Sequence, residues 1–224
     1  MTDTSTPDTY RRIYEAFDAP VSRFDCGRKC APHNGGEPVC CSTQHAVPVA
    51  TMAEWRLLKS RTNLWRIFKP YDASTRQIKE SLHHSCRAIE CKGFMSCERQ
   101  NRTLACRAFP FFPYITADKS FIGLSYYWIF EDRCWIQSNL QVVGRPFVEE
   151  FVRAYEILFA EDREEHQAYV DQSAAMRRVF TRRRRPIPLI HRDGGYFKIM
   201  PRTHQLRPAR AEDFPKHGPY RYGE

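Results

Sequence analysis

Nine cysteines dominate the chemistry that this sequence of 224 residues could perform. Most of them stand in two groups, and one more follows further along the chain: Cys26, Cys30, Cys40 and Cys41; Cys86, Cys91, Cys97 and Cys106; then Cys134. Thiolates are soft ligands that bind zinc and iron strongly where a compartment keeps them reduced. Eight thiols would fill two tetrahedral zinc sites, and a [4Fe-4S] cluster takes four. The pattern therefore predicts a protein that binds zinc or iron.

A disulfide framework is the alternative use of so many cysteines. Such frameworks are typical of short secreted chains, and an odd number of cysteines cannot pair completely. The amino-terminal residues are polar and lack the basic-then-apolar order of a secretory signal. No window approaches the roughly 18 uninterrupted apolar residues of a membrane span. We therefore expect a cytoplasmic protein without a membrane span, whose thiols stay reduced.

The second cysteine group contains the most specific phrase in the chain. It consists of Cys97, eight further residues, and then Cys106 followed by Arg-Ala-Phe-Pro-Phe. An upstream loop that ends in the pair Cys40 and Cys41 accompanies it. Together these features resemble the YkgJ-type cysteine-cluster family, also called the CxxCxxCC zinc- or iron-chelating domain. The resemblance covers about residues 24–136.

The resemblance implies a set of metal ligands. Eight cysteines match the family's positions: Cys26, Cys30, Cys40, Cys41, Cys91, Cys97, Cys106 and Cys134. Cys86 is left over, either as a spare thiol or as an extra ligand. Family members are often labelled iron–sulfur oxidoreductase-like, and one branch is similar to flagellin lysine methylases. The resemblance therefore adds a redox role, an accessory role beside an enzyme, and a protein lysine methylase-like activity as alternatives.

The segments between the cysteines predict the scaffold that must position them. Thr51 and Glu54 form a capping-box pattern, which begins a helix whose apolar face extends to Phe68. A second helical stretch covers residues 73–84. Residues 111–130 are rich in aromatic residues around a short turn and predict a β-hairpin. A long helix begins at Pro146, and its apolar stripe predicts core packing.

These elements predict an α+β fold. We expect a small antiparallel sheet, two or three helices and cysteine-rich metal-binding loops, with a basic extension at the C-terminus. The predicted boundaries are a lead-in over residues 1–23, a cysteine-cluster domain over residues 24–175, and the extension over residues 176–224.

The whole basic excess of the chain lies in that extension. Residues 176–224 hold thirteen Lys or Arg against four acids, which equals the net charge of +9 of the entire chain. A small hairpin is predicted around Asp193 and the two glycines after it. Basic runs interleaved with aromatic residues favour nucleic-acid binding, which makes a zinc-scaffolded nucleic-acid module the alternative function. An acidic protein is the other partner that would suit this extension. The basic run itself is Arg182, Arg183, Arg184 and Arg185.

No other pattern identifies a catalytic residue. The sequence contains neither a phosphate-binding glycine loop nor a nucleophile elbow. The acidic pair of Glu164 and Glu165 lies in a charged stretch that predicts a solvent-exposed face, and neighbours on a helix point to different sides. The sequence therefore leaves open whether the protein is an enzyme.

Overall fold

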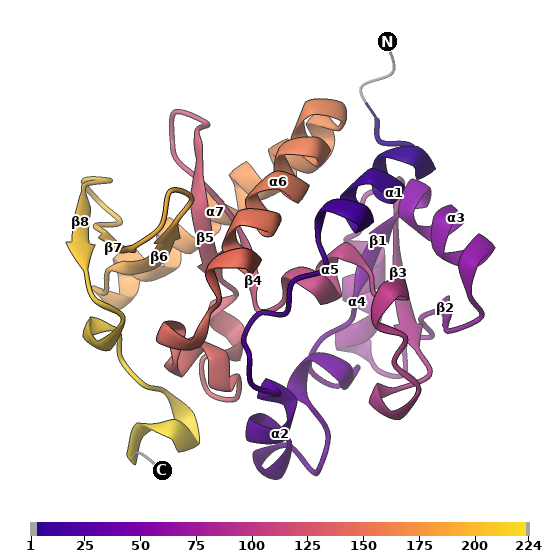
Figure 1. Cartoon of the computed structure of the whole chain (residues 1–224), viewed down its shortest axis with the longest axis horizontal. Coiled ribbons are helices and arrows are strands. Elements are labelled where there is room, and N and C mark those ends of the chain that lie inside the picture. The colour runs from indigo at the N-terminus through magenta and orange to yellow at the C-terminus, as the bar shows by residue number, and fades with distance from the viewer. Residues whose placement is uncertain (1–3, 223–224) are drawn as a thin grey trace.

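The structure, a computed structural model, describes residues 4–222 and has an α+β fold built on two antiparallel sheets (Figure 1). The first sheet has three strands in the order β1-β3-β2, and the second has five in the order β4-β5-β6-β7-β8. Seven α-helices accompany the sheets over the described residues. The α+β class is confirmed, but the predictions of a single small sheet and of two or three helices were wrong, because short helices and a second sheet form from segments without a strong local pattern.

The bounds of these elements are as follows. The strands are Val49–Thr51 (β1), Trp65–Ile67 (β2), Cys86–Cys91 (β3), Phe111–Ile115 (β4), Phe121–Tyr126 (β5), Ile187–His191 (β6), Tyr196–Ile199 (β7) and Leu206–Ala209 (β8). The helices are Pro7–Ala16 (α1), Cys26–Cys30 (α2), Met52–Arg61 (α3), Ala73–Glu80 (α4), Leu104–Ala108 (α5), Arg145–Glu161 (α6) and Arg163–Arg183 (α7).

Helix α3 begins where the capping pattern predicts. The hydroxyl of Thr51 accepts a hydrogen bond from the backbone N–H of Glu54 at 3.1 Å. The helix ends at Arg61 and does not continue to Phe68, because the next segment forms β2 and pairs with β3. Helix α4 is likewise shorter than predicted and ends at Glu80. The apolar residues beyond Arg61 therefore pack from strand β2 and the residues that flank it.

The predicted hairpin of residues 111–130 is confirmed as β4 and β5, with the strand ending at Tyr126. The hairpin predicted around Asp193 is also present, as β6 and β7. Strand β6 pairs with β5 at Gly123 and Leu124, so the C-terminal strands extend the same sheet. Gly123 has a φ of +152°, and a Cβ there would collide with the carbonyl oxygen of Ile190. A glycine permits this close approach of β5 to β6.

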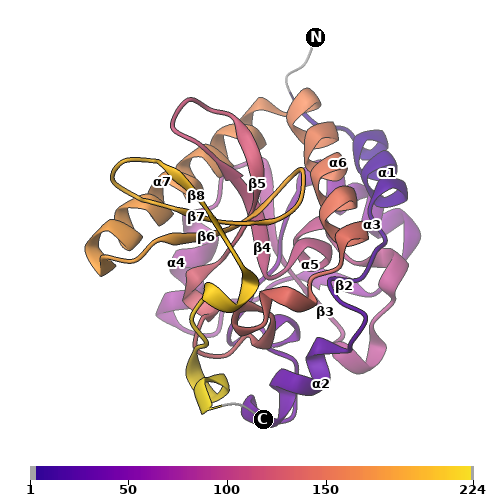
Figure 2. The same ribbon diagram turned by 60° about the vertical axis from the view of Figure 1, so that its left-hand side comes forward.

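Two long helices cover the faces of the five-stranded sheet. Helix α7 crosses one face (Figure 2), where its Phe180 belongs to a buried cluster with Phe112 of β4. Helix α6 covers the opposite face, where the ring of its Phe147 lies 5.9 Å from the ring of Phe111 in β4. This alternation follows from the period of two along a β-strand. Asp162 separates the helices and caps α7 by accepting from the N–H of Glu165.

The C-terminal end of the described chain returns to the first cysteine loop. In both ribbon views it lies near α2 (Figures 1 and 2). The hydroxyl of Tyr220 donates to the carbonyl oxygen of Arg133 at 3.1 Å, and its ring lies 5.5 Å from that of His33. A Cβ on Gly218 would collide with the backbone of Asp132. Residues 217–220 are therefore closely packed against two cysteine-bearing segments.

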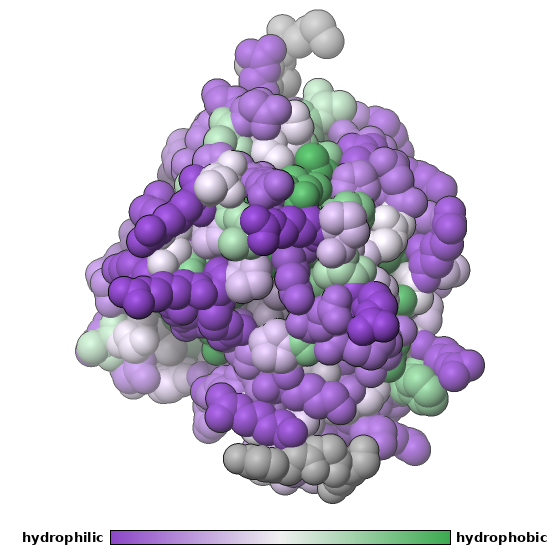
Figure 3. Space-filling view, turned by 90° about the vertical axis from the view of Figure 1, so that its left-hand side faces the viewer, coloured by the Kyte–Doolittle hydropathy of each residue, from purple (hydrophilic) through white to green (hydrophobic). Residues whose placement is uncertain are grey.

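The surface that carries β6, β7 and β8 is largely hydrophilic, with only scattered apolar residues (Figure 3). Edge strand β8 is mostly exposed and contains Arg207 and Pro208, which discourage pairing with another sheet.

None of the helices within residues 4–222 combines the length and the apolar character needed to cross a bilayer.

Candidate functional site

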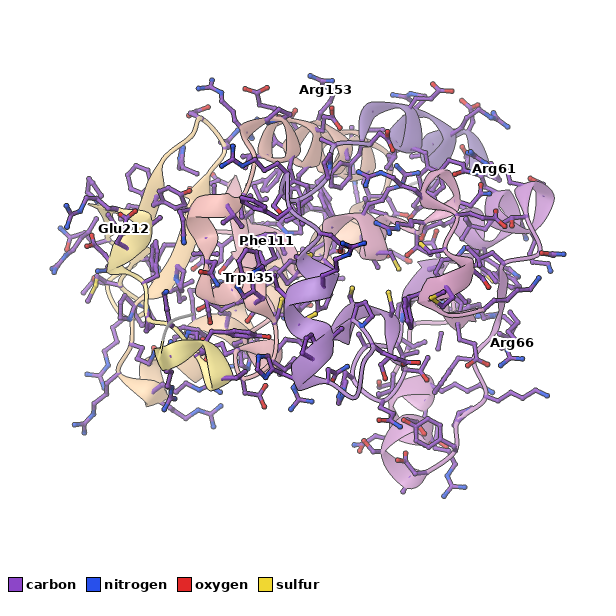
Figure 4. All side chains as sticks on the ribbon, turned by 60° about the horizontal axis from the view of Figure 1, so that its bottom comes forward. Arg61, Arg66, Phe111, Trp135, Arg153 and Glu212 are labelled. Atoms are coloured by element: carbon purple, nitrogen blue, oxygen red, sulfur yellow. The ribbon has the colours of Figure 1, made fainter. Side chains whose placement is uncertain are left out.

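Six cysteines line one cavity of about 620 Å³, which we call the cysteine cavity. They come from four segments of the chain: Cys26; Cys40 and Cys41; Cys91 and Cys97; and Cys106. Figure 4 shows sulfur atoms gathered in the middle of the molecule, to the right of Phe111 and Trp135. Thiols that are far apart in sequence thus line a common space.

The first loop brings its cysteines to the cavity through two short helical turns. Cys26 begins helix α2, and Asp25 caps that helix by accepting from the N–H of Gly27 at 3.0 Å. Cys40 and Cys41 end the 3-10 helix Val39–Cys41, and their sulfur atoms are 3.9 Å apart. Four ligands at the usual Zn–S length of about 2.3 Å stand about 3.8 Å from one another in a tetrahedron. This pair already has the separation of two ligands on one zinc ion.

Strand β3 separates Cys91 from Cys86. The two residues stand at opposite ends of the strand, where Cys91 pairs with Trp65 and Cys86 pairs with Thr51. At about 3.3 Å per residue, five steps place their Cα atoms about 17 Å apart. The two cannot bind the same ion, and Cys86 lies outside the cysteine cavity, with its sulfur 3.9 Å from a carboxylate oxygen of Glu165.

The second cysteine group is ordered by a cap and an arginine. Thr103 caps helix α5 by accepting from the N–H of Cys106 at 3.0 Å. Its neighbour Arg102 donates from Nε to the sulfur of Cys97 at 3.1 Å. Burial lowers the pKa of Arg102, but the hydrogen bond to Cys97 and electrostatic interactions with the nearby cysteines outweigh this effect, so the pKa is raised overall. The sequence did not single out Arg102. A usable signal was its place directly before Thr103, the cap of a helix that contains Cys106.

Cys30 and Cys134 lie behind the wall of the cavity. Both are buried, and each lies close enough to Cys26 or its neighbours for their charges to interact. Cys134 precedes the 3-10 helix Trp135–Ser138, which packs on α2. Burial raises the pKa of Cys134 strongly, because a charged thiolate there would be poorly solvated. These two thiols belong to the same region of the molecule but do not reach the open space.

Burial keeps most of the cavity thiols protonated. It raises the pKa of Cys26 to about 11 and that of Cys106 to about 12. Cys40 and Cys41 share a hydrogen bond, which raises the pKa of Cys40 and lowers that of Cys41. Cys41 is therefore the first of this pair to become a thiolate. A metal ion that binds here must displace protons from the other thiols.

The thiols of the cysteine cavity suit a soft metal ion, but their present positions are not those of four ligands around one ion. Zinc and iron–sulfur centres prefer thiolates, and the cavity offers six of them together with apolar walls such as Phe109 and Leu64. Within residues 4–222, no group of three or more His, Cys, Asp or Glu side chains is arranged to hold an ion as it stands. The thiols would have to rotate or shift toward one another, and the set of eight ligands stays a prediction.

The four arginines predicted to bind nucleic acid do not form one free surface. Arg183 and Arg185 donate to the buried carboxylate of Glu131 at 3.0 and 3.2 Å. Arg182 and Arg184 are exposed at the end of α7. Half of the basic run therefore fixes the end of α7 to the body of the protein. Binding of nucleic acid or an acidic partner by the extension stays a prediction.

No protein-family model, curated protein or solved structure matches this chain. The resemblance to the YkgJ-type family therefore depends on the motif from Cys97 to Phe111 and on the loop before it.

Proposed function

We propose that this protein binds zinc or iron through thiolates of the cysteine cavity. One observation carries the proposal: cysteines from four segments line a single cavity, and the pair Cys40 and Cys41 has a sulfur separation that fits one tetrahedral ion. Ordinary core cysteines have no reason to face a common open space, because a buried thiol packs as a small apolar group. The spacing resembles the YkgJ-type motif, which points to the same chemistry.

The surroundings of the thiols support this role. Four thiolates around a divalent ion carry net negative charge, which the guanidinium of Arg102 offsets through its contact with Cys97. The backbone N–H of Gly93 donates to the sulfur of Cys91 at 3.4 Å and stabilises the thiolate form. A bound zinc would polarise a ligand in an open coordination position, and an iron–sulfur cluster would carry electrons. The residues of this chain orient the ligands and limit the access of water.

Metal analysis of protein purified under anaerobic, reducing conditions tests the proposal. We expect zinc or iron in near-integral stoichiometry, and Cys97→Ser and Cys106→Ser should each lower it by more than half. Cys86→Ser is the matched control, because this partly buried cysteine lies outside the cavity. Absorbance near about 400 nm that bleaches on reduction or in air identifies an iron–sulfur cluster and not zinc. Protein with less than about a tenth of an equivalent of either metal, or equal losses in all three variants, overturns the proposal.

A further inference from the structure

A second pocket of about 330 Å³ adjoins the cysteine cavity. The two spaces share part of their walls, including Cys40, Cys106 and Phe109. Two carboxylates and four tyrosines line the second space: Glu54, Glu165, Tyr10, Tyr127, Tyr155 and Tyr169. We call it the acidic pocket. Neither its carboxylates nor its tyrosines have a part in the proposed metal centre.

Glu54 is fixed in the wall of this pocket. Its side chain is 2% exposed. One carboxylate oxygen accepts from the hydroxyl of Tyr14 at 2.7 Å and from the backbone N–H of Leu104 at 2.6 Å. These bonds connect α1, α3 and α5 and hold the carboxylate in the wall of the pocket. Both bonds use the same oxygen, so neither occupies the second one.

Glu165 lines the pocket as a partly buried residue and has little hydrogen bonding there. Within residues 4–222, its carboxylate meets a single donor, the weakly donating thiol of Cys86 at 3.9 Å. The charged groups that act on it most strongly are all acidic, namely Asp162, Glu54 and Glu164. Burial, with these charges added, raises the pKa of Glu165 to about 7, and burial raises that of Glu54 to about 7. Burial disfavours the charged form of both carboxyl groups, and a cation bound beside them would favour it.

The tyrosines supply the rest of a cation site. The rings of Tyr155 and Tyr169 lie edge to face, with centroids 5.3 Å apart, and their hydroxyls are 3.3 Å apart. The faces of aromatic rings attract cations, most strongly where water is excluded. An anion would be repelled by the ionised carboxylates, and a neutral ligand would not favour their ionised form. No group of metal-ligating side chains in the described part of the chain is arranged to hold an ion here.

We propose that the acidic pocket binds an alkylammonium ion, with its charged head between Glu54 and Glu165 and its stem against the tyrosine rings. The volume suits a head with a stem of a few carbons. Ile129, which is 62% exposed, lines the rim and marks the side open to solvent. The ligand is either a free amine or the side chain of a lysine on another molecule, which share this chemistry. The inference does not depend on metal in the cysteine cavity.

Calorimetric titration of the full chain with n-butylammonium tests the inference, in amine-free buffer at about pH 8, where both carboxylates are ionised. We expect saturable one-to-one binding, and no comparable binding of n-butanol, which has a similar shape and no charge. Glu165→Gln should weaken binding at least tenfold. Glu164→Gln is the matched control, because it removes an exposed carboxylate from the same turn of α7 and should leave binding unchanged.

The outcomes separate the two sources and can reject the inference. Tighter binding of Nα-acetyl-lysine N-methylamide than of n-butylammonium assigns the pocket to a lysine side chain, and the reverse assigns it to a free amine. Glu165→Gln must unfold in urea like the wild type, and Glu54→Gln serves as a second variant. Equal binding of n-butanol, unchanged binding in Glu165→Gln, or no saturable binding up to about 50 mM amine overturns the proposal, whatever the metal content.

Discussion

The buried carboxyl group of Glu54 should make the stability of the protein depend on pH. Burial raises its pKa from 4.5 to about 7, although the hydrogen bonds from Leu104 and Tyr14 favour the charged form. In the unfolded chain the group titrates near its ordinary value. Because the folded state binds this proton more tightly, the group stabilises the fold most below about pH 4.5 and loses that contribution as the pH rises through 7. A difference of about 2.5 pKa units corresponds to about 3 kcal/mol.

The assay is urea unfolding of the wild type and Glu54→Gln from about pH 5 to about pH 8 in reducing buffer. Glutamine keeps the shape and an acceptor oxygen for Leu104 but cannot ionise. The unfolding free energy of the wild type minus that of the variant should fall by about 2 to 3 kcal/mol across this range. The control is Glu80→Gln, which removes a solvent-exposed carboxylate and should show a nearly flat difference. A constant difference for Glu54→Gln, or one that grows with pH, refutes the reasoning.

Three further outcomes can be measured. Gly123→Ala should lower the free energy of unfolding by more than about 2 kcal/mol, because a Cβ collides with the next strand. Gly144→Ala, where the nearest atom would lie 3.8 Å from the Cβ, should change it by less than about 1 kcal/mol, and equal effects would contradict the close packing of β5 and β6. Glu131→Ala should cost about 1 to 3 kcal/mol in urea unfolding, because Arg183 and Arg185 lose their shared partner; no loss would mean that the pairs contribute nothing. Metal affinity, measured by competition with a chelator, should rise with pH, because binding displaces protons from thiols whose pKa burial has raised; a pH-independent affinity argues against thiolate ligands.

Local signals in the sequence were sufficient for several elements. The hairpin of β4 and β5, the start of α3 and the start of α6 each depend on a turn or cap within a few residues. The length of α3 could not be predicted in this way. An apolar residue such as Trp65 fits the face of a helix as well as a short strand, and pairing with β3 decides between them. Sheet order likewise depends on contacts between distant segments.

The acidic pocket was the least predictable part of the molecule. The charged stretch that includes the first turn of α7 suggested exposure, yet Glu165 turns inward while Glu164 stays in solvent. A signal was present in the spacing: Tyr169, Ser173 and Met176 follow Glu165 at steps of four, four and three, which is one face of a helix. That face is buried against the sheet, so the rotation of α7 carries Glu165 inward. Its meeting with Glu54 depends on tertiary packing, which no local pattern encodes.

The packing of residues 217–220 against the first cysteine loop has a consequence for how the protein is made. On the ribosome, Cys30 and Cys134 emerge long before Tyr220, whose side chain lies near both of them in the folded state. The nascent chain therefore passes through a stage in which these thiols remain uncovered. At that stage the two thiols would be accessible from solvent, and residues 217–220 would cover them only later.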